Sequence, residues 1–137
     1  MDRVQELEEK LREDRIKIYN DILEPFIILL TKAEGLPNTK EYRGKTNIEA
    51  GSEKALSFEY KQTAFKLSLI GSDDVLRSFN NLMQYFYNED TKKNSKEFMV
   101  LFGTLLLEIR KSVGNQNTDL EPLEMLEFLI TDIRKYQ

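Results

Sequence analysis

The residues of this sequence with the clearest chemical potential are closely spaced carboxylates. Asp73 and Asp74 are adjacent, and Glu121, Glu124 and Glu127 recur at spacings of three. Adjacent carboxylates are suitable oxygen ligands for a divalent cation such as Mg²⁺, whereas acids in the first turn of a helix stabilise its positive end. We favour helix capping for the two aspartates and a solvated helix face for the three glutamates.

Histidine and cysteine are both absent from the sequence. Without them there is no thiol catalysis, no thiolate metal site and no disulfide, and the commonest general base near neutral pH is missing. The Glu-x-x-His element of helical di-metal proteins is excluded, and no Glu-x-x-Asp element is present to complete the acidic set of an all-α nucleotide pyrophosphohydrolase. We therefore predict no catalytic residue, no cofactor and no metal site.

The chain carries a formal net charge of -4 and has a pI near 5.0. Nucleic-acid binding requires clustered Lys and Arg, and the short basic groups here lie beside acids, so we expect no nucleic-acid partner. The acidic beginning of the sequence lacks an apolar leader. Its apolar runs fall short of the roughly 20 residues that a membrane crossing needs. We therefore expect a cytoplasmic protein with no membrane span.

The most apolar stretch of the chain is Phe98 to Gly114, which predicts a core helix over 98–113. Its apolar residues recur at spacings of three and four, and Arg110 and Lys111 occupy the expected last turn. Gly114 then provides the left-handed residue that commonly follows a helix. This element is expected to be the most buried part of the fold.

The remaining pattern predicts further helices on both sides of this core helix. They are expected at Asp2 to about Lys32, at about Glu53 to Ile70, at Val75 to about Tyr87 behind a Ser72 cap, and at about Leu120 to Tyr136. In the second of these helices, Phe58, Phe65 and Leu69 are expected in the core. A polar turn is expected from Asn88 to Asn94, with Ser95 as the cap of the core helix. Pro25 predicts a kink in the first helix or a helix restarted at that residue. The sequence thus predicts an all-α bundle of four to five helices, with a long kinked N-terminal helix, in a single domain spanning 1–137.

Two segments outside this core are predicted to contact partners. The first is residues 1–14, where Val4, Leu7 and Leu11 form a narrow stripe like a short coiled-coil seam, which predicts a projecting arm that self-associates. The second is the long loop at about 34–52, in which Tyr42, Arg43 and Lys45 are the residues expected to meet a partner. Mobility of the loop is the alternative, and Asn47 to Ala50 can form a short helical turn.

Three motifs together suggest a family relationship. They are RIKIYNDILEPF from Arg15 to Phe26, KLSLIGSDDVL from Lys66 to Leu76, and LLLEIRKSVGN from Leu105 to Asn115. With them the chain resembles a group of uncharacterised bacterial all-helical proteins, some of which carry an upstream transmembrane or coiled-coil segment. The resemblance implies an all-α fold and brings no catalytic residues with it.

These observations favour a non-enzymatic helical interaction or structural module. Its expected partner is a second copy of the chain, giving a homo-oligomer, or another helical protein. The alternative is a protein that binds a small ligand, or a Mg-dependent enzyme that uses carboxylates on a nucleotide-like substrate. A third interpretation is an accessory protein that recognises nucleic acid through the loop from Glu34 to Ser52.

Overall fold

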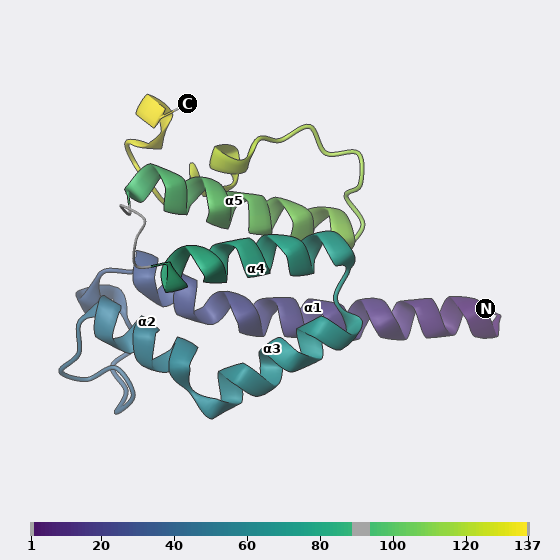
Figure 1. Cartoon of the computed structure of the whole chain (residues 1–137), viewed down its shortest axis with the longest axis horizontal. Helices are drawn as coiled ribbons and strands as arrows, with labels where there is room; N and C mark the ends of the chain where they lie inside the picture. The colour runs from purple at the N-terminus through teal and green to yellow at the C-terminus, as the bar shows by residue number, and fades with distance from the viewer. Residues whose placement is uncertain (1, 89–93, 137) are drawn as a thin grey trace. The chain divides into compact units, whose positions relative to one another are not determined.

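The structure, a computed structural model, describes residues 2–88 and 94–136 (Figure 1). These residues form five α-helices and three short 3-10 segments with no β-strand, which confirms the predicted all-α class. The chain divides into two compact units, Met1–Ile70 and Gly71–Gln137, called here the N-terminal and C-terminal units. Within the described ranges, no helix combines the length and the apolar character that a membrane crossing requires.

The N-terminal unit is built around its first helix. Its elements are α1 (Arg3–Leu30), the 3-10 segment η1 (Ala33–Gly35), α2 (Asn47–Leu56) and α3 (Phe58–Ile70). The Asp2 carboxylate caps α1 by accepting from the N–H of Gln5 at 2.9 Å. The helix continues through Pro25, so the prediction of a helix restarted there is wrong, while the predicted kink stays a prediction.

The predicted loop at 34–52 is shorter in the structure, because α2 begins at Asn47 and contains Gly51. This glycine is buried where α2 crosses α1: a Cβ added to it would lie 2.9 Å from the Leu29 side chain and 3.1 Å from the Pro25 carbonyl oxygen. Gly51 therefore permits close helix packing and is not a turn residue. The helix predicted from Glu53 to Ile70 is also interrupted, at Ser57, which separates α2 from α3.

Two hydrogen bonds fix α3 on α1. The buried Tyr60 hydroxyl donates to the Ile22 carbonyl at 2.6 Å, and Arg15 Nε donates to the Ile70 carbonyl at 2.6 Å. Because the later residue of α3 meets the earlier residue of α1, the two helices are antiparallel. Arg15 also places a cation at the C-terminus of α3, where the helix dipole favours positive charge.

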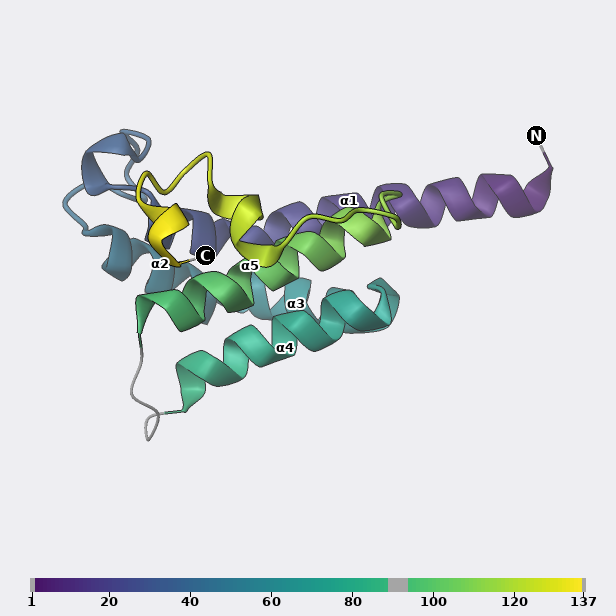
Figure 2. The same cartoon turned by 90° about the horizontal axis from the view of Figure 1, so that it is seen from above.

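The C-terminal unit contains α4 (Asp73–Tyr87), α5 (Ser95–Ser112) and the 3-10 segments η2 (Pro122–Leu126) and η3 (Ile133–Tyr136). α4 and α5 lie side by side, as Figures 1 and 2 both show. The predicted start of α4 is confirmed, since the Ser72 hydroxyl accepts from the N–H of Val75 at 3.4 Å. Gly114 has the predicted left-handed conformation, with φ of 129°.

Asn94 caps α5, one residue before the predicted Ser95 cap, by accepting from the N–H of Glu97 at 2.7 Å. The polar turn predicted from Asn88 to Asn94 falls mostly on residues 89–93, outside the described residues.

The helix predicted from Leu120 to Tyr136 is wrong, because this segment forms two 3-10 segments joined by turns. Thr131 and Asp132 between them are poor helix formers. The backbone of η2 lies directly on α5: a Cβ added to Gly103 would come within 2.2 Å of the Pro122 carbonyl oxygen. The missing side chain of Gly103 therefore permits the close contact between η2 and α5.

Candidate functional site

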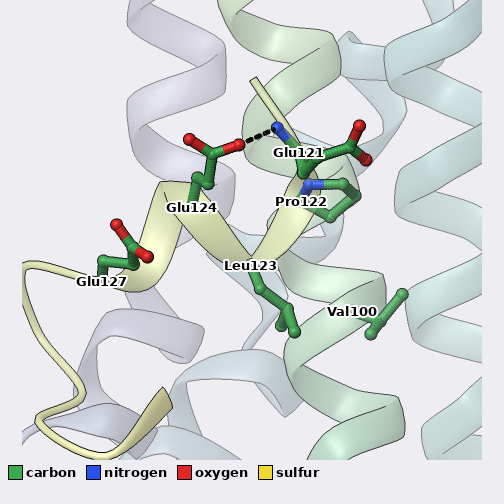
Figure 3. A pocket seen from close by; sticks show the side chains of 6 residues that line it. All are labelled: Val100, Glu121, Pro122, Leu123, Glu124 and Glu127. Atoms are coloured by element: carbon green, nitrogen blue, oxygen red, sulfur yellow. Dashed lines mark hydrogen bonds between the residues drawn. The ribbon is translucent and has the colours of Figure 1, made fainter. Parts of the chain in front are cut away.

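The three glutamates of the C-terminal segment do not converge on a common point. They surround a hollow of about 550 Å³ whose apolar lining includes Val100 and Leu123 (Figure 3). The Glu124 carboxylate accepts from the N–H of Glu121 at 3.0 Å, and the Glu127 carboxylate pairs with Arg134 at 3.2 Å. In Figure 3 the Glu121 carboxylate points away from the other two. These acids therefore cap and pair within their own segment.

The adjacent aspartates serve as helix-start residues. Both lie in the first turn of α4 behind Ser72, and Asp74 forms an ion pair with Arg77 at 3.2 Å. Throughout the described ranges no three Asp or Glu side chains lie close enough together to hold a metal ion. The capping interpretation of Asp73 and Asp74 fits this geometry.

The aromatic residues at the end of α4 are part of the packing of the C-terminal unit. Phe86 contacts Tyr85 and Phe98 edge to face at 5.4 Å and 5.6 Å between ring centroids, and Phe98 stacks on Phe102 at 5.9 Å. The Tyr85 hydroxyl donates to the Asn94 carbonyl at 3.0 Å. This row joins α4 to α5.

The three residues predicted to form a partner loop have different surroundings. Lys45 pairs with Glu53 of α2, whereas Arg43 is exposed. Tyr42 is half-buried beside Lys54, and its pKa is raised by burial and by the nearby carboxylates Glu41 and Glu24. The structure thus uses Lys45 and Tyr42 to hold the loop against its own unit, and leaves Arg43 facing solvent.

The predicted arm is the N-terminal part of α1. Residues 2–13 are all exposed, and Figure 1 shows α1 continuing past the end of α3, the helix beside it in the same unit. Its stripe is open to solvent, with exposed fractions of 63% for Val4, 59% for Leu7 and 38% for Leu11. Arg15 marks the base of the arm, because its hydrogen bond to Ile70 is where α1 meets the end of α3.

A second exposed apolar surface was assigned to the core by sequence reasoning. Phe58, Phe65 and Leu69 were expected inside, but they are 70%, 73% and 83% exposed. With Gln62 they form one stripe along α3, called here the α3 outer face, opposite the buried residues Tyr60 and Leu67. α3 has apolar residues on two opposite faces, and periodicity alone does not show which of them is buried.

Comparison of the chain with protein-family models, with curated proteins and with solved structures gave no match. The function proposed below therefore rests on the geometry of the described residues.

Proposed function

We propose that this chain is a non-enzymatic helical interaction module that self-associates through the N-terminal arm, residues 2–14. The observation that carries the proposal is the stripe of Val4, Leu7 and Leu11, which is exposed on a helical segment whose residues 2–13 all face solvent. A helix with a narrow apolar seam and charged residues elsewhere is stabilised when a second helix covers that seam. The proposed partner is a second copy of the chain.

The charges beside the stripe favour parallel pairing of two arms. With Val4 and Leu11 at heptad position a and Leu7 at d, Arg3 falls at g and Glu8 at e. In a parallel pair, Arg3 of one arm faces Glu8 of the other, and this occurs twice by symmetry. In an antiparallel pair, Arg3 would face Lys10 and repel it. The pairing ends before Arg15, because that side chain is bonded to Ile70.

We also propose a cytoplasmic location, with which the absence of cysteine is compatible. The resemblance to bacterial helical proteins, some of them with a coiled-coil segment, is in line with an associating role.

Light scattering of the full chain over a micromolar concentration series tests the proposal. We expect the mass of the wild-type protein to rise with concentration. Leu7→Lys should weaken the association by at least about tenfold, since it places a charge in the seam. Ile27→Lys is the matched control, because Ile27 is an exposed apolar residue of the same helix outside the arm. A protein that stays monomeric throughout, and is unchanged by deletion of residues 1–14, would contradict the proposal.

A further inference from the structure

The α3 outer face carries three large apolar side chains that are exposed on one helix of the N-terminal unit. Its members Phe58, Phe65 and Leu69 are each at least 70% exposed. The opposite face of the same helix is already occupied, since Tyr60 and Leu67 are buried. A helix that is apolar on both faces is typical of a buried helix, which indicates that the outer face has a partner.

We propose that the α3 outer face is a second self-association surface, on which α3 packs antiparallel against α3 of a second copy. Phe58, Gln62, Phe65 and Leu69 follow one another at spacings of four, three and four, the a and d pattern of a helix seam. In an antiparallel pair with a two-fold axis at the middle of this stripe, Phe58 faces Leu69 of the second copy, and Gln62 faces Phe65. Every apolar residue of the stripe is then covered. The surface is separate from the arm.

The charges flanking the stripe favour a second copy of the chain as the partner, and they favour the antiparallel alignment of the two α3 helices. Glu59 and Lys66 lie on the same flank, one heptad apart, and the antiparallel alignment brings Glu59 of each copy to Lys66 of the other. In a parallel alignment Lys61 would instead face Lys66 and repel it. Lys66 is exposed and lines a hollow together with Asp14 and Asp21. Within the described part of the chain, neither Glu59 nor Lys66 forms an ion pair. Both are therefore available to a second copy.

The size of the face fits a reversible dimer. An aromatic side chain that becomes buried contributes about 150–250 Å², so the stripe and its flanks cover roughly 500 Å² on each copy. The total of about 1,000 Å² is near the lower limit for a specific interface. We therefore expect dissociation constants in the micromolar range.

The face is also held in a fixed position before association. The hydrogen bonds from Tyr60 to Ile22 and from Arg15 to Ile70 fix α3 near both of its ends. Little backbone freedom is then lost when a second copy binds, which lowers the cost of association.

The first experiment distinguishes association through the α3 outer face from association through the arm. Sedimentation equilibrium of the full chain is compared among the wild type, Leu7→Lys, Phe65→Glu and the double variant, with circular dichroism to verify the fold of each. We expect Leu7→Lys to remain dimeric through α3, Phe65→Glu to weaken the α3 contact by at least about 30-fold, and the double variant to be monomeric. Ile48→Glu is the matched control, since Ile48 is an exposed apolar residue of α2 outside both surfaces.

The outcomes distinguish the two proposals. If Leu7→Lys is monomeric at millimolar concentration, the α3 proposal is overturned while the arm proposal stands. If Phe65→Glu is monomeric and Leu7→Lys behaves like the wild type, the arm proposal fails and the α3 proposal stands. A wild-type protein that is monomeric at millimolar concentration overturns both, and another helical protein is then the partner to seek.

The second experiment tests the direction of pairing, in the Leu7→Lys background. Lys66→Glu should weaken the dimer about fivefold, because Glu59 then faces an acid in both symmetric contacts. Adding Glu59→Lys restores opposite charges and should bring the affinity back to within about twofold of the starting protein. In a parallel pair Lys66→Glu would strengthen the dimer instead, by pairing with Lys61, and that result would overturn the antiparallel arrangement.

Discussion

Lys54 joins three segments of the N-terminal unit through its ion pairs. Its Nζ lies 3.5 Å from Glu24 of α1 and 3.7 Å from Glu41 of the loop, while Lys54 itself belongs to α2. Burial lowers the pKa of Lys54, but the two carboxylates outweigh it, so the net shift is upward. Tyr42 lies beside this cluster, and burial followed by the charges of Glu41 and Glu24 raises its pKa as well.

These shifts predict that the free energy of unfolding decreases in alkaline solution. A raised pKa means that the folded state binds a proton that the unfolded state has already released, so stability falls as the pH rises above the ordinary values near 10 for Tyr42 and 10.5 for Lys54. Below that window the contribution of both residues is fully present. Urea unfolding at several pH values measures the effect.

The Tyr42→Phe variant shows how much the Tyr42 hydroxyl contributes to this loss of stability at alkaline pH. We expect its stability to fall less steeply above about pH 10 than that of the wild type, because the shifted tyrosine no longer titrates. Tyr87→Phe is the matched control for loss of a phenol, at an exposed position on α4. Identical alkaline slopes for wild type and Tyr42→Phe would contradict the assignment.

At the scale of elements, Gly103 determines how the C-terminal segment packs. A Cβ at this position would come within 2.2 Å of the Pro122 carbonyl oxygen and 2.7 Å of its carbonyl carbon. Both atoms are backbone, so no change of side-chain rotamer relieves the contact. We expect Gly103→Ala to displace η2 from α5 and to destabilise the protein by about 1–3 kcal/mol.

Hydrogen exchange should show which residues lose stability in the Gly103→Ala variant. In the Gly103→Ala variant we expect amide protection to fall in residues 120–130 and to be retained in α1 and α3. Gly114→Ala is a useful comparison, because it disturbs a left-handed residue, with φ of 129°, just after the same helix. Unchanged protection over 120–130 in Gly103→Ala would contradict the packing role of this glycine.

The elements that the sequence predicted well are those with local signals. Ser72 before Asp73 begins α4, and Gly114 follows α5, because a cap and a left-handed residue act within a few positions along the chain. The apolar spacing of α5 likewise predicted a helix that joins the core, and Phe102 and Leu105 are among its buried residues. These features depend little on the rest of the fold.

The incorrect predictions concern residues whose environment depends on tertiary contacts, which local sequence patterns do not contain. Gly51 suggested a loop but lies inside α2, where its missing side chain permits close contact with Leu29. Phe65 and Leu67 are both apolar, and only the position of α1 determines that Leu67 is buried and Phe65 is exposed. The stripe of the arm is visible in the sequence because it is apolar among charges, and its role stays a prediction. α3 has apolar residues on two opposite faces, so its pattern does not show which face is buried.

At the scale of the whole molecule, introduced cysteines would report the arrangement of two copies directly, since the natural chain has none. Chains carrying Phe58→Cys and chains carrying Leu69→Cys should form a mixed disulfide when combined and oxidised, because these positions face each other in the proposed antiparallel pair. Two Phe58→Cys chains should not cross-link. Positions 58 and 69 are eleven residues apart along α3, so the two thiols would be separated by about 16 Å along the helix axis.

Non-reducing electrophoresis measures the yield of each cross-link, and Ile48→Cys provides the background from random collisions at an exposed apolar position. Efficient cross-linking of Phe58→Cys with itself would contradict the antiparallel arrangement.

The hydrogen bond between Arg15 and Ile70 has a consequence for assembly, because it joins the base of the arm to the end of α3. A chain with two self-complementary surfaces has a valence of two and grows stepwise, each copy linking two neighbours. Since Arg15 fixes the angle between the surfaces, successive copies would be added with a constant geometric repeat. A chain with one surface blocked would then act as a terminator, so adding more of it would shorten the assemblies on average.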